Sequence, residues 1–333
     1  MIARSTKQNQ HPQWVDELRH AYVDPLELLN CLNLSARDVG LTAEVNGFPF
    51  RVPRPFAARI RPASPNDPLL RQVLPCDLEL STHSDFQHDP VGDLNAQRTP
   101  ALLHKYHGRA LLIVTGGCAI NCRYCFRRHF PYAQSVGAAK LDEAVNEIRA
   151  DDSISEVILS GGDPLMLSDE SLARLVKALD SIGHVRRLRI HSRLPVTIPS
   201  RITHTLIDLL IESRLTPVLV VHINHAQEID DDLSEQFKRC SAAGIQLLNQ
   251  SVLLRGVNDS AVELSRLSEA LFDAAVLPYY VHLLDRVAGA AHFDMSEGQA
   301  RLIADQMREK LPGYLMPRFV REIAGQPSKT PIA

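Results

Sequence analysis

The sequence predicts an α/β fold: a partial (β/α)6 barrel with a helical N-terminal extension and a short C-terminal segment. Short, nearly continuous apolar runs recur from about residue 110 onward, and amphipathic helical stretches separate them. Such runs are typical of parallel strands buried on both faces, and their alternation with helices favours a parallel, barrel-like sheet. A complete eight-stranded barrel needs about 250 residues. Fewer follow residue 110 in this chain of 333, so the barrel should be partial.

The first hundred residues differ from the rest because they are rich in proline and aspartate and lack the regular rhythm. Two short helical patches, 14–22 and 25–34, are accompanied by irregular stretches such as 51–68. We therefore expect the chain to have three parts. These are the helical extension over 1–100, the barrel core over 101–295 and the C-terminal segment over 296–333.

Each predicted barrel unit joins one apolar run to one amphipathic helix. Ser168, followed by two acidic residues, should cap the second of these helices. The predicted strands are 110–115, 155–160, 186–192, 216–223, 245–251 and 279–284. The predicted apolar faces of the first two helices are Leu141, Val145 and Ile148, and Leu172, Leu175, Val176 and Leu179.

Polar residues gather at or just beyond the carboxyl ends of five predicted strands. Barrel enzymes build their active sites from that rim, and a buried strand tolerates polar groups poorly unless they are paired or used. We expect these ends to form one polar mouth. The residues are Ser160, Gly161, Gly162 and Asp163, then Ser192 and Arg193, His222, Asn249 and Gln250, and Asp285.

Charge and hydropathy argue against several classes of partner. The 36 basic and 39 acidic residues leave a formal net charge of −3, so neither nucleic acid nor an anionic membrane is expected to bind. No run approaches 18 apolar residues, so no membrane span is expected. The N-terminus lacks the apolar stretch of a secretory signal, and the cytoplasm is the expected compartment.

Three of the six cysteines fall close together in the segment GGCAINCRYC, directly after the first predicted strand. Cys118, Cys122 and Cys125 suit a [4Fe–4S] cluster, which normally takes four thiolates. With three, one iron stays free to bind a small molecule. Two other interpretations remain open: a structural zinc site with His129 as fourth ligand, or inert thiols that cluster by chance.

The C-x3-C-x2-C spacing resembles the signature of the radical S-adenosylmethionine enzymes, and it implies a barrel of that type. In that family the open iron binds the amino and carboxylate groups of the methionyl moiety, and Tyr124 matches an aromatic residue near the adenine. The strand end Ser160, Gly161, Gly162 and Asp163 resembles the glycine-rich motif that contacts the methionyl amino group. His222 and Gln250 match further cofactor contacts, although either could be a satisfied hydrogen bond of the rim.

Over residues 80–333 the chain more narrowly resembles the lysine 2,3-aminomutase family, through segments such as KYHGRALLIVTGGCAINCRYCFRRHF, LSGGDPLMLSD and LLNQSVLLRGVND. That resemblance implies conversion of (S)-α-lysine to (R)-β-lysine with three cofactors: a [4Fe–4S] cluster, S-adenosyl-L-methionine and pyridoxal 5′-phosphate. An external electron donor is also implied. Segments such as RIHSRLP and PSKTP are similar to a bacterial branch whose β-lysine is attached to elongation factor P by a separate ligase.

The resemblance also assigns residues to pyridoxal phosphate. Lys329, close to the end of the chain, matches the family's Schiff-base lysine, and Arg109 matches a phosphate contact with Tyr106 beside the cofactor. Each has a simpler interpretation from sequence alone. Lys329 could be a solvated tail residue, Arg109 a cap at a strand start, and Tyr106 part of the core edge.

For the substrate, Arg127 matches a clamp on the lysine carboxylate, where a planar guanidinium suits bidentate binding. Asp285 and Glu322 match two acids that hold the side-chain ammonium, although structural salt bridges would explain either acid. Glu322 departs from the family pattern, which has aspartate there, so the pose of lysine is open. The family also continues into zinc-binding cysteines, whereas this chain stops soon after Lys329 and Cys240 has no sequence partners, so no zinc is expected.

Two rival functions remain open. One is a radical S-adenosylmethionine enzyme of another reaction type, such as methyl transfer, which would not need Lys329, Asp285 and Glu322 together. The other is a non-catalytic iron–sulfur or zinc protein used for structure or electron transfer.

Overall fold

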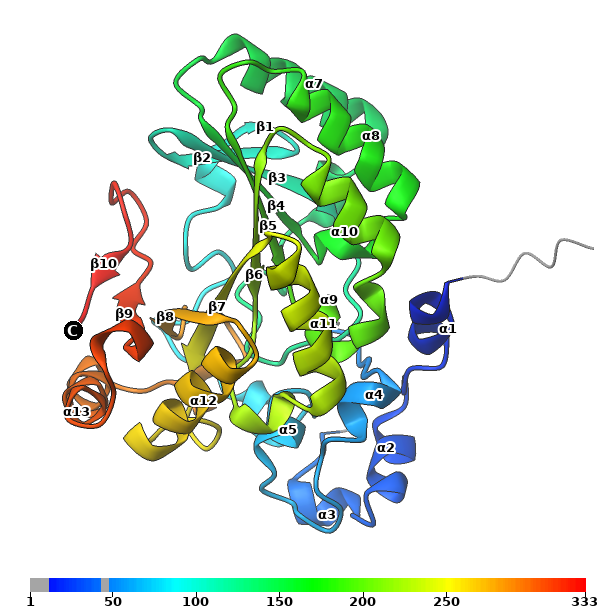
Figure 1. Ribbon diagram of the computed structural model, residues 1–333. Coiled ribbons are helices and arrows are strands. Elements are labelled where there is room, and N and C mark those ends of the chain that lie inside the picture. The colour runs from blue at the N-terminus through cyan, green and yellow to red at the C-terminus, as the bar shows by residue number, and fades with distance from the viewer. Residues whose placement is uncertain (1–11, 43–47) are drawn as a thin grey trace, which may run out of the picture.

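The computed structural model describes residues 12–42 and 48–333. The N-terminal stretch in which no secretory signal is expected lies largely in residues 1–11, outside the described residues. One ten-stranded sheet forms the centre of the molecule, with its strands paired in chain order from β1 to β10. It is curved and open (Figure 1), as a partial barrel requires. The fold class predicted from the sequence is therefore confirmed.

The middle of the sheet consists of the six predicted strands, each parallel to the next of the six. The other four extend its two edges: β1 and β2 pair antiparallel on one side, β9 is parallel to β8, and β10 is antiparallel to β9. The strands are β1 (Gln97–Thr99), β2 (Leu102–Tyr106), β3 (Arg109–Thr115), β4 (Glu156–Gly161), β5 (Arg187–Ser192), β6 (Thr216–Val221), β7 (Gln246–Leu253), β8 (Leu277–Leu283), β9 (Arg318–Arg321) and β10 (Thr330–Pro331).

Helices connect the strands, and short 3₁₀ turns shape the loops. The α-helices are α1 (Gln13–Arg19), α2 (Pro25–Cys31), α3 (Ala36–Val39), α4 (Arg54–Ala57), α5 (Pro68–Arg71), α6 (Tyr132–Ser135), α7 (Ala138–Ala150), α8 (Asp169–Asp180), α9 (Leu194–Thr197), α10 (His204–Ile211), α11 (Asp231–Ala242), α12 (Ala261–Asp273) and α13 (Glu297–Arg308). The 3₁₀ turns are η1 (Asp77–Leu80), η2 (Leu94–Ala96), η3 (Pro164–Met166), η4 (Pro199–Arg201), η5 (Ala226–Glu228), η6 (Ala291–Phe293) and η7 (Gly313–Leu315).

The long helices cover the convex face of the sheet and bury their apolar stripes against it (Figure 1). In α7, Val145 and Ile148 are buried and Leu141 packs at the edge of the core; in α8 all four predicted apolar residues are buried. The Ser168 hydroxyl caps α8 as predicted, accepting a hydrogen bond from the Ser171 N–H at 3.2 Å. None of the helices among the described residues has the length and apolar character that crossing a membrane would need.

The N-terminal extension forms its own small core beneath the barrel, in which Leu28, Phe56 and Leu69 are fully buried. This core includes Ile120 and touches Cys122, so the extension packs directly on the cysteine loop. The stretch 51–68, which the sequence analysis treated as irregular, contains the single-turn helix α4. The predicted division at residue 100 falls inside the β1–β2 hairpin, and the division before residue 296 immediately precedes α13.

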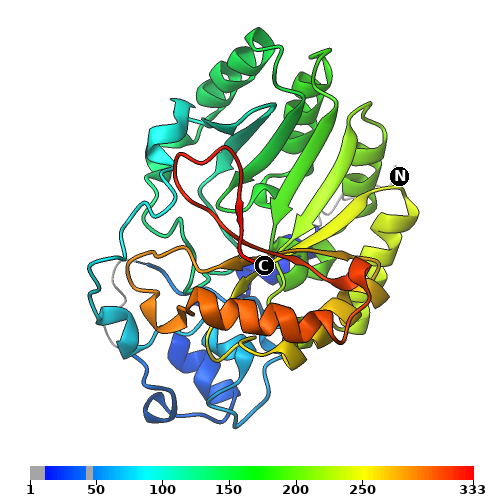
Figure 2. The ribbon, with the colours of Figure 1, turned by 90° about the vertical axis from the view of Figure 1, so that its left-hand side faces the viewer.

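The C-terminal segment returns across the open, concave side of the sheet (Figure 2). It supplies β9 and β10, and β9 pairs with β8 so that Tyr280 lies opposite Arg318. Because β9 pairs with β8 and β10 pairs with β9, the last residues of the chain lie beside the barrel strands. Residues from both ends of the barrel can therefore line one cavity.

Candidate active site

A cavity of about 660 Å³ opens at the carboxyl ends of the parallel strands, within the range usual for small-molecule sites. Its wall contains every residue predicted above as a cluster ligand or as a cofactor or substrate contact. They are Tyr106, Arg109, Cys118, Cys122, Tyr124, Cys125, Arg127, Ser160, Gly161, Gly162, Asp163, His222, Gln250, Asp285, Glu322 and Lys329. Residues more than two hundred positions apart thus face one space.

A second hollow of about 690 Å³ lies at the opposite, amino-terminal ends of β3, β4 and β5. Of the predicted site residues, only Arg109 lines it. In parallel barrels the chemistry is built at the carboxyl ends, because the loops that follow the strands are free to carry functional side chains. We therefore place the active site in the first cavity.

The three cysteines occupy the loop that follows β3, and a backbone hydrogen bond from Cys125 N–H to the Cys122 carbonyl at 3.0 Å tightens it. Burial, and then the neighbouring Cys122 thiol, raise the pKa of Cys125 to about 11. Burial likewise raises the pKa of Cys118. These shifts favour the protonated thiols, and a bound metal reverses that preference because it binds the thiolate in place of the proton. Three thiols on one cavity wall therefore fit an iron–sulfur cluster with one open iron.

The zinc interpretation finds less support. His129, its possible fourth ligand, stacks on His88 with ring centroids 4.2 Å apart and is absent from the cavity wall. Within residues 12–42 and 48–333, no group of three or more His, Cys, Asp or Glu side chains is arranged around a single ion. A [4Fe–4S] cluster is a different case, because each of its irons takes its own thiolate.

The glycine pair at the end of β4 leaves room for this loop. A Cβ atom on Gly161 would lie 2.3 Å from the Thr115 carbonyl oxygen, and its φ of +133° suits only glycine. A Cβ atom on Gly162 would lie 2.3 Å from the Gly117 carbonyl oxygen, just before Cys118. The motif therefore lets two backbone segments meet beside the cysteines.

Gly162→Ala is expected to lose most of its iron after anaerobic reconstitution, because the added methyl group must push the cysteine loop away from β4. Iron and sulfide assays measure this directly. Gly183→Ala is the matched control, since a Cβ atom there meets no atom within 4 Å. Full iron content in Gly162→Ala would show that the close approach is unimportant.

Asp163 holds the rim together through its carboxylate. One oxygen accepts from the Ser192 hydroxyl at 2.7 Å and from Leu165 N–H at 3.1 Å. The other accepts from the N–H groups of Arg193 and Leu194, both at 2.8 Å. The carboxylate is thus occupied by the protein itself, although Asp163 lines the cavity.

Not every predicted rim residue reaches the cavity. Ser192 lies outside its wall and donates to Asp163 instead. Asn249 also lies outside, with its amide bonded to the backbone of Ile223. Because successive side chains of a strand point to opposite faces, Gln250 faces the cavity and Asn249 the helices. The expectation of one mouth formed by all these residues was therefore wrong for Ser192 and Asn249.

His222 and Gln250 lie side by side in the cavity wall, with their Nε2 atoms 3.0 Å apart. His191 on β5 lies 3.4 Å from the same Gln250 amide nitrogen. Burial lowers the pKa of His222 to about 3 and holds those of His191 and His282 well below the ordinary value. These imidazoles are therefore neutral at pH 7.

Sequence analysis did not single out His191 or His282, although each is a polar residue inside a predicted strand. The Nε2 atom of each is buried without a partner among the described residues, and both rings line the cavity. A polar atom buried in this way is costly unless something bonds to it. Both therefore offer contacts to a bound molecule.

A row of alternating charges runs along one side of the cavity. Arg127 Nε pairs with Asp93 at 2.6 Å, and the other oxygen of Asp93 pairs with Lys105 at 2.6 Å. Lys105 continues to Glu322 at 2.9 Å, and the second oxygen of Glu322 pairs with Lys329 at 2.9 Å. Burial works against ionised Glu322, but the two lysines outweigh it and bring its pKa to about 2. Glu322 is therefore a salt-bridged carboxylate, one of the alternatives left open by its sequence.

Asp93 and Lys105 are site residues that the sequence did not reveal. Burial works to raise the pKa of Asp93, but Arg127 and Lys105 outweigh it, so the net shift is downward. Arg127 also donates to the Ser160 hydroxyl at 2.9 Å. Its neighbour Arg128 pairs with buried Glu79 at 2.8 Å and is structural. Arg127, the residue predicted to bind the substrate carboxylate, is thus held by Asp93 and by Ser160.

Asp285 differs from its predicted partner acid. No hydrogen bond from the described residues reaches its carboxylate. Burial, and then the negative charge of Glu322, raise its pKa to about 7. A buried carboxylate without a cation is unfavourable, so Asp285 favours a positively charged ligand.

The Lys329 amine faces the cavity rather than bulk solvent, with its side chain 23% exposed. Arg109 lies with its guanidinium 4.8 Å from the centre of the Tyr106 ring, and its buried Nε has no partner among the described residues. An amine, an incompletely bonded guanidinium and a phenol suit an aldehyde cofactor that carries a phosphate. The residues present therefore fit pyridoxal phosphate.

Comparisons with known proteins identify the family of the chain. The Radical SAM superfamily matches residues 112–267. L-lysine 2,3-aminomutase from Escherichia coli (strain K12) is 49% identical over 323 residues, which cover 96% of this chain and 94% of that protein. The chain belongs to the lysine 2,3-aminomutase family of radical S-adenosylmethionine proteins.

Other members of the family span a wide range of similarity. The enzyme of the same name from Haemophilus influenzae (strain ATCC 51907 / DSM 11121 / KW20 / Rd) is 48% identical and covers 95% of this chain and 94% of its own length. The one from Clostridium subterminale is 37% identical, covering 83% of this chain and 67% of its own. Among solved structures, a radical SAM methyltransferase from Sphaerobacter thermophilus has a TM-score of 0.49 at 19% identity, over 68% of this chain and 72% of that one.

Proposed function

We propose that this chain is a lysine 2,3-aminomutase, an isomerase that converts (S)-α-lysine to (R)-β-lysine. The observation that carries the proposal is the content of one cavity: three clustered thiols, the Lys329 amine, the Arg127 guanidinium and the unpaired acid Asp285. A methyl transferase or an electron-transfer protein has no use for the last three together. Full-length relatives that carry the aminomutase name support the same reaction.

Three groups complete the site: a [4Fe–4S] cluster on Cys118, Cys122 and Cys125, S-adenosylmethionine beside it, and pyridoxal phosphate on Lys329. Once bound, they supply a 5′-deoxyadenosyl radical that abstracts hydrogen and a carbonyl carbon that holds the migrating nitrogen. The chain supplies binding, orientation and a cavity wall that excludes water.

The protein's own residues define how lysine would lie. Arg127 is held by Asp93 and Ser160. It would bind the substrate carboxylate with the remaining in-plane N–H groups of its guanidinium. Asp285 would bind the side-chain ammonium, while Glu322 would keep Lys105 and Lys329 in place beside it. His222 and Gln250 would contact S-adenosylmethionine, together with Tyr124 and the glycine motif at Gly161 and Gly162.

The test is anaerobic incubation of the reconstituted protein with isotopically labelled lysine, S-adenosylmethionine and a reductant, followed by chromatographic separation and fragmentation mass spectrometry, because α- and β-lysine have the same mass. We expect β-lysine that retains the label. A methylated product would favour the second radical reaction type, and a protein that binds iron but converts no amino acid would favour the electron-transfer interpretation.

The Asp285 carboxylate gives a pH-dependent prediction. Since only its ionised form pairs with an ammonium, kcat/KM for lysine should rise as the pH increases through about 7. Asp285→Asn should remove that rise and lower kcat/KM by roughly thirty- to thousand-fold, which corresponds to about 2–4 kcal/mol for a buried ammonium without its partner. Steady-state kinetics across pH 6–9 measure both effects.

Norleucine provides the control, because its side chain is similar in length to that of lysine but carries no ammonium group. Wild-type protein should prefer lysine strongly, and Asp285→Asn should narrow that preference. If the variant loses activity on lysine while its preference over norleucine stays the same, Asp285 does not recognise the ammonium.

We further propose a cytoplasmic role in which the β-lysine serves modification of elongation factor P by a separate ligase, with an external electron donor for the cluster. The similarity of RIHSRLP and PSKTP to that branch supports this. Purified elongation factor P, its ligase, ATP, lysine, S-adenosylmethionine, a reductant and this enzyme should together yield a β-lysyl group. Fragmentation distinguishes that group from an α-lysyl group of the same mass, and it should be absent when Lys329→Ala replaces the wild type.

A further inference from the structure

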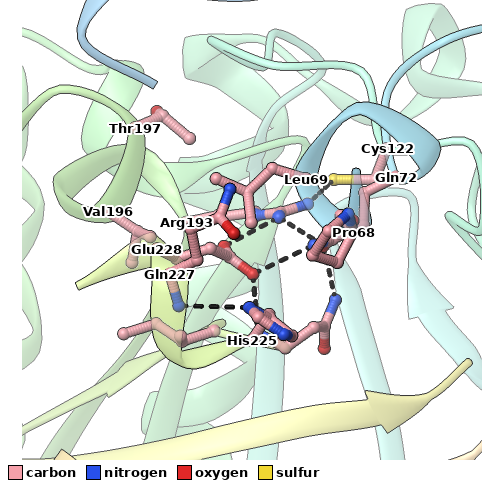
Figure 3. A network of polar contacts seen from close by, with 12 residues as sticks. Pro68, Leu69, Gln72, Cys122, Arg193, Val196, Thr197, His225, Gln227 and Glu228 are labelled. Carbon is pink, nitrogen blue, oxygen red and sulfur yellow. Dashed lines mark hydrogen bonds and ion pairs between the residues drawn. The ribbon is translucent and has the colours of Figure 1, made fainter. Parts of the chain in front are cut away.

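Arg193 is a buried arginine whose guanidinium reaches one of the three cysteines. It follows β5 and is 6% exposed. Its Nη1 donates to the Cys122 sulfur at 2.7 Å and to the Tyr124 hydroxyl at 2.6 Å. Figure 3 shows the side chain extended from the strand end toward Cys122. The proposed reaction gives this residue no role.

The other terminal nitrogen of the guanidinium, Nη2, is held by two hydrogen bonds. Nη2 donates to Gln72 Oε1 at 2.7 Å and to Glu228 Oε2 at 2.9 Å. Glu228, itself fully buried, accepts at its other oxygen from the N–H groups of Asn224 at 2.9 Å and His225 at 3.1 Å, and from the Gln72 amide at 3.1 Å. These hydrogen bonds (Figure 3) hold Nη1 toward Cys122, and the buried Nε of Arg193 has no partner among the described residues.

The local charges suit a negatively charged neighbour. A buried guanidinium is costly unless it is paired and hydrogen-bonded, and Glu228 supplies one compensating charge. A cysteine that ligates iron is a thiolate, so Cys122 would supply a second. A charge-assisted hydrogen bond from Nη1 to that sulfur would then replace the bond to a neutral thiol.

Hydrogen bonds to cluster sulfurs and nearby charge are among the factors that set the reduction potential of an iron–sulfur centre. Reduction adds one electron and therefore one negative charge. A fixed cation beside a ligand sulfur stabilises the reduced form more than the oxidised form.

We propose that Arg193 is a positioning residue for the cluster: it donates to the Cys122 thiolate and raises the reduction potential, so that a one-electron donor reduces the cluster more readily. This inference rests on Cys122 as a cluster ligand, part of the proposed function. The alternative is that Arg193 only joins the N-terminal extension, through Gln72, to the barrel.

The two roles are separated by a redox titration of the reconstituted protein without S-adenosylmethionine, with dithionite as reductant and the reduced cluster followed by electron paramagnetic resonance. Arg193→Gln and Arg193→Lys are compared with Arg201→Gln and Arg201→Lys. Arg201 is also buried, donates to the Leu165 carbonyl at 2.7 Å and pairs with Asp169 at 2.8 Å. It makes no contact with a cysteine among the described residues, and so it controls for loss of a buried arginine.

For Arg193→Gln we expect about a tenfold lower ratio of reduced to oxidised cluster at the wild-type midpoint, which is about 59 mV for a one-electron couple. Arg193→Lys should shift in the same direction by less, because it keeps the charge but has one nitrogen to serve both Cys122 and Glu228. Both Arg201 variants should match the wild type.

An unchanged midpoint in either iron-loaded Arg193 variant would overturn the proposal. So would loss of iron from both of them with the fold intact by circular dichroism, because Arg193 would then be a structural requirement only. A wild-type protein that binds no iron would instead refute the cluster assignment itself, so the two failures are distinguishable.

Discussion

Replacement of Cys122 by alanine is expected to abolish reductive cleavage of S-adenosylmethionine. Cys118, Cys122 and Cys125 all line the cavity, and each would anchor one iron of the cluster. No described cysteine other than these three lines the cavity, so none can take the place of a lost ligand. The same loss is expected for Cys118→Ala and Cys125→Ala. Measuring 5′-deoxyadenosine formed with excess dithionite tests it.

The remaining cysteines provide internal controls. Cys240 is buried in α11 and Cys31 is exposed at the end of α2. Replacing either by alanine should leave iron content and cleavage close to wild type. Cys76 is partly buried with its sulfur 3.9 Å from His292 Nε2 and should behave in the same way. Full cleavage by Cys122→Ala would refute the cluster assignment.

The central strands were predictable because burial on both faces leaves a simple signature. A run such as ALLIVT can be recognised without knowing its neighbours. The edge strands have no such signature. β1 has three residues and β10 two, and β9 reads RFVR with charges at both ends. These strands exist because the neighbouring strand offers free N–H and C=O groups, which the local sequence does not encode.

Prediction of the site follows the same division. Cys118, Gly162 and Lys329 belong to motifs that can be read locally or by resemblance. Asp93 belongs to no quoted segment, and Lys105 begins one without an assigned role; both became visible only when the fold placed them between Arg127 and Glu322. His191 and His282 did carry a signal, since each interrupts an apolar strand, and polar residues in such strands should be examined as site candidates.

The charge row also changes how the acid pair is understood. The resemblance suggested that both carboxylates hold the substrate ammonium, with a structural salt bridge as the alternative for either acid. Glu322 already binds two lysines, each at 2.9 Å, whereas Asp285 binds none among the described residues. Asp285 is therefore the acid left free for a ligand, and Glu322 the one that orders the lysines.

Lys329→Ala is expected to eliminate aminomutase activity and covalent attachment of pyridoxal phosphate, while iron content and cleavage of S-adenosylmethionine survive. Two lysines line the cavity among the described residues, Lys105 and Lys329, and both contact Glu322 at 2.9 Å. Attachment requires an unprotonated amine. Burial works to lower the pKa of Lys105, but Asp93 and Glu322 outweigh it and the net shift is upward. Lys105 is therefore held as an ammonium between two carboxylates, whereas Lys329 contacts one carboxylate among the described residues.

Borohydride treatment followed by peptide mass analysis identifies the lysine that carries the cofactor. We expect the modified peptide to contain Lys329 in the wild type and in Lys105→Ala, and no modified peptide in Lys329→Ala. Lys105→Ala should keep the attachment but weaken binding of lysine, because Asp93 and Glu322 lose the cation between them and the Arg127 clamp loses its support. Modification of Lys105 in the wild type would instead make Lys105 the lysine that carries the cofactor. The row of alternating charges would then bind the cofactor rather than order the substrate site.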